Sequence, residues 1–300
     1  MNGFLNILKP PGMTSAAVVA FVRRLTGEKH VGHAGTLDPD AAGVLPVMIG
    51  RAARLFDFLV DKQKTYVTEA AFGFATDTQD ASGTVIATGT DYPTLEAVRA
   101  AAKTLEGDIW QRPSMYSAIK KDGVPMYERA RNGETLEVPP RQVHVEKITV
   151  HQEMPRHGVL MTVDCGKGTY IRSICADLGE ALGCPAYMRF LLRTRSGAFT
   201  LDTAMTLEEL TARKEAGTLA DCLLPLDWPL GHMPRVQAPV WLEKQVRNGV
   251  RLPVKKLTGA EALPEGGVTR VYLRDTFWGM CAREGDELVW RCVIPPEENI

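Results

Sequence analysis

A histidine and two carboxylates stand on a short segment that glycine and proline residues punctuate. Residues 32–46 read GHAGTLDPDAAGVLP and contain His33, Asp38 and Asp40. Pro39 restricts Asp38 to extended conformations and so limits where its carboxylate points, and the glycines permit tight turns. A carboxylate on a rigid loop is suited to nucleophilic or acid–base chemistry. Because an Asp-Pro turn is also common in loops without function, these residues alone leave both interpretations open.

The segment before this loop has the spacing of regular secondary structure. Residues 4–8 form an apolar run that ends at the turn-forming residues 9–12, KPPG, which predicts a strand. The Thr-Ser pair at residues 14–15 is a suitable N-cap, and Gly27 is suited to a helix C-terminus. Apolar residues at positions 18, 21, 22 and 25 predict the helix between them.

Farther along the chain, apolar spacing predicts alternating strands and helices. Residues 31–46 show no period, and we predict a loop over their whole length. Alternating apolar residues predict strands over residues 64–74, 143–150 and 159–165. Helices are expected over residues 51–59, after Pro93-Thr94, after Gly168-Thr169 and after Thr206, where TLEE has the form of a capping box.

Two domains and one insertion are expected. Prolines and glycines around residues 230–238 predict a linker, so we divide the chain into residues 1–232 and 236–300. Short glycine-bounded strands over 268–273, 277–283 and 287–293 make the second domain β-rich. The region 111–142 is rich in Pro, Lys, Arg and Tyr and lacks an apolar stripe, which indicates an excursion from the core.

Composition places the chain among ordinary globular proteins. It has 300 residues, 45% of them hydrophobic, and a net charge of −1. Charge is unevenly spread: residues 1–64 hold eight basic and five acidic residues, whereas residues 65–111 hold two and seven. No apolar run approaches the length of about 20 residues that spans a bilayer, and no signal-peptide pattern is present, so we expect no membrane association and a cytoplasmic location. The six cysteines lack the close pairs of a zinc site, and we expect no metal.

The loop carrying Asp38 resembles the catalytic motif of the TruB-type pseudouridine synthases, G-x-L-D-P-x-A-x-G-x-L-P. Eight fixed positions match within residues 35–46, which makes a chance match improbable. Thr36 stands where other pseudouridine synthase families keep an Arg. Further matched stretches follow in family order between residues 3 and 197: LKPPGMTS at 8–15, KTY at 64–66, PSMYSAIK at 113–120, GKGTYIR at 166–172, and LLR at 191–193 with Arg195.

The resemblance implies a fold and a reaction. The fold is α/β (α+β): a pseudouridine synthase catalytic domain with a mixed, largely antiparallel sheet, the 111–142 insertion gripping RNA, and a small PUA-like RNA-binding domain at 236–300. The reaction is isomerisation of uridine-55 to pseudouridine in the T-loop of tRNA. Because substrate and product are isomers, no redox cofactor, nucleotide or metal is required, which agrees with the lack of a phosphate-binding or nicotinamide motif.

The resemblance implies three catalytic residues. Asp38 is the carboxylate that acts at C1′ of the ribose, either by attacking the sugar or through a glycal route, and the sequence does not separate the two. Arg172 pairs with it, because a buried carboxylate takes up a proton unless a cation favours its charged form. Tyr66 stacks on the uracil and is a candidate base. Without the resemblance, Arg172 is most simply a surface residue and Tyr66 a core residue.

The resemblance also implies contacts with RNA. A uridine in a structured loop must flip out to reach such a pocket, and His33 is the family-like candidate to fill the vacated space. Tyr170 and Leu192 resemble residues that line the uracil pocket. The remaining expected RNA contacts are Lys9, Lys120, Arg129 and Arg131.

Rival functions stay open at this point. A non-catalytic tRNA-binding or tRNA-folding protein, a subunit for guide-RNA-directed modification, and a nucleoside hydrolase with one carboxylate would each use parts of the same scaffold. The presence of Asp38, Tyr66 and Arg172 together favours the isomerase. We expect tRNA as the partner, no obligatory protein partner, and a monomer.

Overall fold

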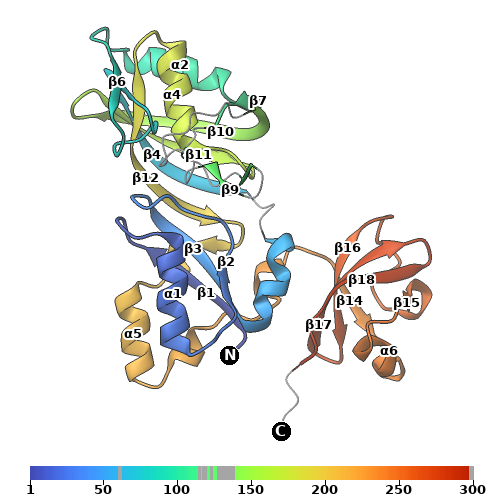
Figure 1. Cartoon of the computed structure of the whole chain (residues 1–300). Helices are drawn as coiled ribbons and strands as arrows, with labels where there is room; N and C mark the ends of the chain where they lie inside the picture. The colour runs from blue at the N-terminus through green and yellow to red at the C-terminus, as the bar shows by residue number, and fades with distance from the viewer. Residues whose placement is uncertain (60–62, 114–115, 117–119, 122–123, 127–138, 297–300) are drawn as a thin grey trace.

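A nine-stranded sheet forms the body of the molecule (Figure 1). The computed structural model describes residues 1–59, 63–113, 116, 120–121, 124–126 and 139–296. Every strand pairing in this sheet is antiparallel except that of β12 with β3, as expected for a mixed, largely antiparallel sheet. In order, the path runs through β1 (Gly3–Lys9), β3 (Ala42–Ile49), β12 (Ala186–Ser196), β4 (Lys64–Phe72), β11 (Gly158–Cys165), β10 (Arg141–Met154) and β7 (Gly107–Gln111), with β2 (Val31–His33) beside β3 and β13 (Phe199–Thr200) beside β12.

Helices cover the sheet at both of its ends (Figure 1). Helices α1 (Ser15–Thr26) and α5 (Leu207–Glu215) lie near β1, while α2 (Leu95–Thr104) and α4 (Ile171–Ala181) lie near β10 and β12. The predicted caps are confirmed: the Thr14 hydroxyl accepts a hydrogen bond from the amide of Ala17, and Gly27 ends α1 at φ 74°. The capping box at Thr206 is also present. Residues 50–58 form a 3-10 helix, η1 (Gly50–Phe58).

The prediction of a loop over residues 31–46 is wrong for most of that segment. Only residues 34–41 are irregular, because β2 precedes them and β3 begins at Ala42. Gly43 and Pro46 conceal β3 in the sequence, since both residue types are unusual in strands. Here Gly43 adopts φ 116° beside the backbone of Arg193, where a side chain has no room. The loop that carries Asp38 is therefore anchored at each end by a strand.

A second sheet follows at the C-terminal end of the chain. Its strands run in the order β14 (Arg235–Ala238), β16 (Val268–Leu273), β17 (Thr276–Glu284), β18 (Glu287–Val293) and β15 (Leu252–Pro253), accompanied by α6 (Glu243–Arg247). This β-rich unit has a core of its own. It also shares an apolar cluster with the large sheet, in which Met280 and Ile294 join Phe4, Val44 and Phe199.

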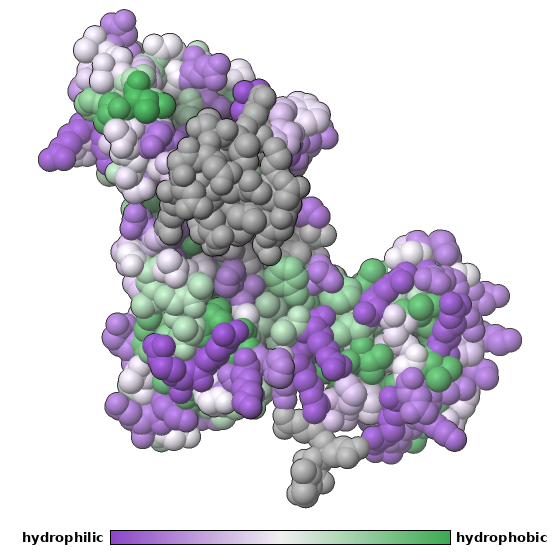
Figure 2. All heavy atoms as spheres, in the orientation of Figure 1, coloured by the Kyte–Doolittle hydropathy of each residue, from purple (hydrophilic) through white to green (hydrophobic). Residues whose placement is uncertain are grey.

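Two hairpins stand apart from these sheets. The hairpin of β5 (Phe74–Thr76) and β6 (Val85–Thr88) exposes Phe74, Val85 and Ile86, and an apolar group is visible over β6 in Figure 2. The second pairs β8 (Lys120–Lys121) with β9 (Val124–Pro125) inside the 111–142 insertion. In the part of the chain that the structure describes, no helix combines the length and apolar character needed to cross a membrane.

Candidate active site

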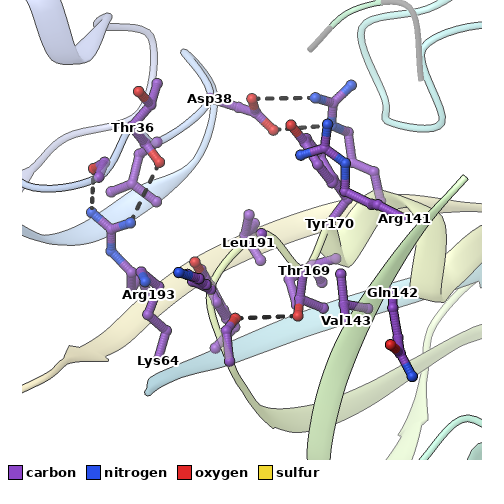
Figure 3. Close-up of a pocket in the computed structure, with 18 residues that line it drawn as sticks. Thr36, Asp38, Lys64, Arg141, Gln142, Val143, Thr169, Tyr170, Leu191 and Arg193 are labelled. Carbon is purple, nitrogen blue, oxygen red and sulfur yellow. Dashed lines mark hydrogen bonds and ion pairs between the residues drawn. The ribbon is translucent and has the colours of Figure 1, made fainter. Parts of the chain in front are cut away.

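The loop carrying Asp38 faces a pocket of about 650 Å³ (Figure 3). Its walls come from segments far apart in the sequence: residues 35–38, the start of β4, the start of β10, residues 166–172 and the middle of β12. All three predicted catalytic residues, Asp38, Tyr66 and Arg172, line this pocket. The fold thus brings together the residues that the resemblance grouped.

Arg172 pairs with Asp38 across the pocket. Its Nε lies 3.0 Å from Asp38 Oδ2, and its Nη2 lies 3.4 Å from Asp38 Oδ1. Arg172 is 3% exposed and stands in the first turn of α4. Its other donors bind backbone, with Nη1 3.0 Å from the carbonyl of Thr78 and Nη2 3.0 Å from that of Tyr116. A guanidinium fixed at this many points holds the carboxylate in one orientation.

Opposing influences set the protonation of Asp38. Burial raises the pKa of Asp38 above its usual value, the cation of Arg172 lowers it, and the nearby carboxylate of Asp80 raises it. The Asp38 side chain is 37% exposed and lines the pocket, so it is accessible to a ligand. Asp38 is therefore a reachable carboxylate whose charged form depends on Arg172.

Asp80 is a site residue that the sequence did not single out. Its Oδ2 lies 3.8 Å from Arg172 Nε, behind the ion pair. Its Oδ1 accepts hydrogen bonds from the Thr78 hydroxyl and from the amide and hydroxyl of Ser82, which fixes the turn that carries it. Asp80 belongs to the acidic stretch 65–111, which was recognised only as a charge imbalance. Distance in sequence concealed its contact with Arg172.

We expect Asp80→Asn to reduce activity about 10- to 100-fold, because Arg172 loses its second carboxylate partner. The pKa of Asp38 should fall at the same time, since a like charge that raises it is removed. A pH profile of the single-turnover rate measures both effects, and its acidic limb should move to lower pH. Asp91→Asn, which removes an exposed carboxylate from the same acidic stretch, is the control and should retain the wild-type profile.

Tyr66 lies on β4 opposite Arg193 of β12. It is buried against the pocket, and burial raises the pKa of its hydroxyl. The prediction that Leu192 lines the pocket is wrong: Leu191 and Arg193 line it instead. Successive side chains of a strand point to opposite faces, so an error of one residue exchanges the pocket face for the other.

Tyr170 lines the pocket at the N-terminus of α4, as predicted. Its backbone is held by the side chain of Gln111, the last residue of β7. The Tyr170 amide donates to Gln111 Oε1 at 2.9 Å, and Gln111 Nε2 donates to the Tyr170 carbonyl at 3.1 Å. This paired contact fixes Tyr170 beside the start of the 111–142 insertion.

His33 ends β2 and lies outside the set of residues that line the pocket. Burial and the cation of Arg193 lower its pKa, which favours a neutral imidazole. Its Nδ1 is buried without a hydrogen-bond partner among the described residues. The proposed part of His33 in base flipping stays a prediction.

The prediction that Lys9 contacts RNA is wrong. It is fully buried at the end of β1, and its Nζ donates to the carbonyls of Pro10, Met13 and Pro39 at 2.8, 2.5 and 2.8 Å. Burial lowers its pKa to about 8. The contact with Pro39 reaches the residue after Asp38, so Lys9 ties the turn after β1 to the catalytic loop instead of facing RNA.

Lys9→Met should destabilise the protein by about 3 kcal/mol, because three backbone carbonyls lose their donor. Urea denaturation followed by tryptophan fluorescence measures the loss. Lys29→Met removes an exposed lysine and serves as the control, with a change near zero expected. Equal stability of Lys9→Met and wild type would contradict the role of Lys9 as a tie between the two segments.

Three further predicted RNA contacts belong to the insertion. Lys120 begins β8, but its side chain lies outside the described residues, as do Arg129 and Arg131 entirely. Among the residues that the structure describes, no group of three or more His, Cys, Asp or Glu side chains is arranged to hold a metal ion.

Comparison with known families assigns this constellation. The family model for the N-terminal domain of TruB family pseudouridylate synthases matches residues 23–171, and that for the tRNA pseudouridylate synthase B C-terminal domain matches residues 172–231. The chain belongs to the TruB family of pseudouridylate synthases. Together the two matches cover every residue that lines the pocket and the large sheet apart from β1, while residues 1–22 and 232–300 lie outside both.

Individual TruB relatives match nearly the whole chain. The tRNA pseudouridine synthase B of Alkaliphilus oremlandii is 45% identical over 93% of this chain and 92% of its own length, and that of Bacillus subtilis is 40% identical over 84% of each. Among solved structures, a Cbf5-Nop10-Gar1 complex contains a chain with 28% identity and a TM-score of 0.77, covering 98% of this chain and 85% of that one. The chain is accordingly an isomerase of the pseudouridine synthase class with the expected fold.

Proposed function

We propose that this chain converts uridine-55 in the T-loop of tRNA to pseudouridine, with Asp38 as the carboxylate that acts at C1′. The observation that carries the proposal is the ion pair of Asp38 with Arg172, at 3.0 Å, in a pocket that Tyr66 also lines. Relatives at 40–45% identity are named tRNA pseudouridine synthase B, which supports tRNA as the substrate. The position within tRNA follows from the motif resemblance around Asp38.

The proposed reaction breaks the bond between N1 and C1′, turns the uracil, and joins C5 to C1′. The proton on C5 leaves and N1 gains one, so atoms balance without a co-reactant. Ionised Asp38 acts at C1′, as nucleophile or as stabiliser of positive charge on the sugar. Arg172 keeps Asp38 charged and aligned, and Tyr66 stacks on the freed uracil and is the candidate base for moving a proton in the glycal route. Flipping the base out of the loop costs a few kcal/mol, and stacking of the base on the Tyr66 ring offsets about 1–3 kcal/mol of this cost.

Charge around the pocket supports an RNA substrate. Among the residues that line the pocket, Asp38 is the single acid and five residues are basic. Two of the five are Arg172, which pairs with Asp38, and Arg193 of β12. The other three form a cationic rim: Lys64, Arg141 and Lys167. A cationic rim attracts the phosphates on either side of a flipped nucleotide. We propose that the insertion 111–142 and the domain 236–300 supply further RNA contacts, and that a monomer acts on tRNA in the cytoplasm.

Two rival functions predict different outcomes when the protein is mixed with tRNA. A non-catalytic tRNA-binding protein would bind the T-loop without isomerising it, and the complete set of Asp38, Tyr66 and Arg172 argues against that. A guide-RNA-directed subunit would need an added RNA to act. The relatives named tRNA pseudouridine synthase B are 40–45% identical to this chain, more than the 28% of the chain in the Cbf5-Nop10-Gar1 complex, which favours direct action on tRNA.

Tritium release tests the proposal. A T-stem-loop RNA with 5-³H-uridine at position 55 should lose one tritium per RNA when mixed with the protein alone, since the C5 proton leaves during isomerisation. Mapping the pseudouridine by carbodiimide-induced stops should locate it at position 55. Binding without release would favour the non-catalytic rival, and accumulation of free uracil would favour a hydrolase.

A further inference from the structure

Arg193 is a buried cation beside the pocket whose charge the proposed chemistry does not use. It lies in the middle of β12 with no exposed surface. Among the described residues no carboxylate forms an ion pair with it. Burying a guanidinium in this way is costly unless other groups solvate it. The groups that do so are backbone carbonyls of the Asp38 loop and of the first residues of β3.

All three carbonyls belong to residues 35–44 around Asp38, and the contact of Arg193 with Thr36 is visible in Figure 3. Arg193 Nη2 lies 3.0 Å from the carbonyl of Gly35, and Nη1 lies 3.4 Å from that of Thr36. Arg193 Nε lies 2.7 Å from the carbonyl of Val44. Two of these contacts precede Asp38 and one follows it, so a single planar group holds both sides of the catalytic loop.

The backbone of Arg193 strengthens the same attachment. Arg193 pairs with Gly43 in the parallel contact of β12 with β3. A Cβ atom on Gly43 would lie 2.2 Å from the carbonyl oxygen of Arg193, so glycine is required for this close approach. The far end of the Asp38 loop is therefore fixed by main chain and side chain of one residue.

Arg193 also affects the ionisation of Tyr66, its pairing partner on the neighbouring strand β4. The guanidinium lowers the pKa of the Tyr66 hydroxyl and opposes the effect of burial. The other charged or titratable groups that influence Tyr66 are Cys165 on β11 and Asp38 on the loop, and both raise its pKa. Arg193 is thus the cation that balances the two negative or potentially negative groups around this hydroxyl.

We infer that Arg193 is a positioning residue of the isomerisation, which holds the loop of Asp38 in its reactive arrangement through the carbonyls of Gly35, Thr36 and Val44. The inference rests on the proposed role of Asp38. It concerns the rate of the chemical step, because a displacement of the carboxylate by about 1 Å lowers that rate about 100-fold. RNA binding depends instead on the cationic rim of Lys64, Arg141 and Lys167 and on the rest of the surface.

The experiment compares Arg193→Ala with Arg189→Ala in the full chain. Arg189 is a matched control because it stands on the same strand and its guanidinium also donates to backbone carbonyls, those of Pro155 and Arg156 at 3.0 and 2.9 Å, but away from the pocket. Single-turnover tritium release, RNA affinity and thermal unfolding are measured for each. We expect Arg193→Ala to lower the rate about 100-fold while RNA affinity stays within about three-fold, and Arg189→Ala to change unfolding only.

Guanidinium rescue separates positioning from general structural damage. The space left by the missing side chain opens onto the pocket that Arg193 lines. Guanidinium ion, well below denaturing concentration, should therefore raise the rate of Arg193→Ala about ten-fold and leave Arg189→Ala unchanged. Arg193→Lys keeps the charge and tests the case in which the alanine variant does not fold. Its rate should be about ten-fold below wild type, because an ammonium does not reproduce the planar fork.

Each outcome decides between the two proposals. Wild-type rates for Arg193→Ala or Arg193→Lys, while wild type releases tritium, overturn the positioning role and leave the proposed function standing. Loss of rate in Arg189→Ala as large as in Arg193→Ala, or absence of guanidinium rescue in a folded Arg193→Ala, also overturns it. No tritium release from wild type would instead remove the proposed function.

Discussion

Asp38→Asn should abolish tritium release while RNA binding persists. The amide keeps the size of the carboxylate and retains an oxygen for Arg172, but it lacks the negative charge that acts at C1′. Loss of a group that forms or stabilises the reaction intermediate costs about 10⁴-fold or more in rate. Single-turnover release from the 5-³H T-stem-loop measures the loss, and filter binding measures RNA affinity on the same samples.

Asp40→Asn is the matched control for this substitution. Asp40 lies two residues away on the same loop and is exposed. Its substitution removes the same charge from the same segment, so any general electrostatic effect on RNA binding appears in both variants. Substantial release by Asp38→Asn, or an equal loss in Asp40→Asn, would contradict the assignment of the chemistry to Asp38.

Arg172→Gln should lower the rate about 1,000-fold and shift its pH dependence. The guanidinium that holds the charged form of Asp38 is lost, as are its contacts with the carbonyls of Thr78 and Tyr116. Because Arg172 lowers the pKa of Asp38, that pKa rises in the variant. The reaction needs the ionised carboxylate, so the acidic limb of the rate profile moves to higher pH, opposite to the shift expected for Asp80→Asn.

A double-substitution cycle tests whether Arg172 acts through Asp38. If it does, Arg172→Gln adds little to the loss already caused by Asp38→Asn. Fully additive losses, or an acidic limb that stays in place, would contradict the proposed link. Stability should fall by about 2–3 kcal/mol, since a buried cation and its hydrogen bonds are removed, and unfolding curves allow the rates to be corrected for unfolded protein.

Local patterns in the sequence predicted the elements that depend on neighbouring residues. The caps at Thr14 and Thr206 and the stop at Gly27 are local signals, and each is present. Alternating residues located β11, and bounding glycines located the three long strands of the C-terminal sheet, to within a residue or two. The pairing of Asp38 with Arg172 was predicted only because the motifs resemble a known family.

Features that depend on distant contacts could not be predicted in the same way. Strand β3 was missed because Gly43 is needed only against the backbone of Arg193. Lys9 was expected to face RNA, since burial of a lysine becomes visible only when the three carbonyls around it are known. Asp80 contacts Arg172 across 92 positions of the chain, and no pattern within either segment indicates the other.

The parallel contact of β12 with β3 has a consequence for the order in which the enzyme is made. Arg193 leaves the ribosome 149 residues after Val44, whose carbonyl it binds. Until β12 has emerged, β3 lacks this neighbour and the carbonyls of Gly35 and Thr36 lack their donor. Closing so long a span is entropically costly and late. A nascent chain therefore carries its Asp38 loop unassembled through most of synthesis and gains a competent site only when the strand bearing Arg193 docks.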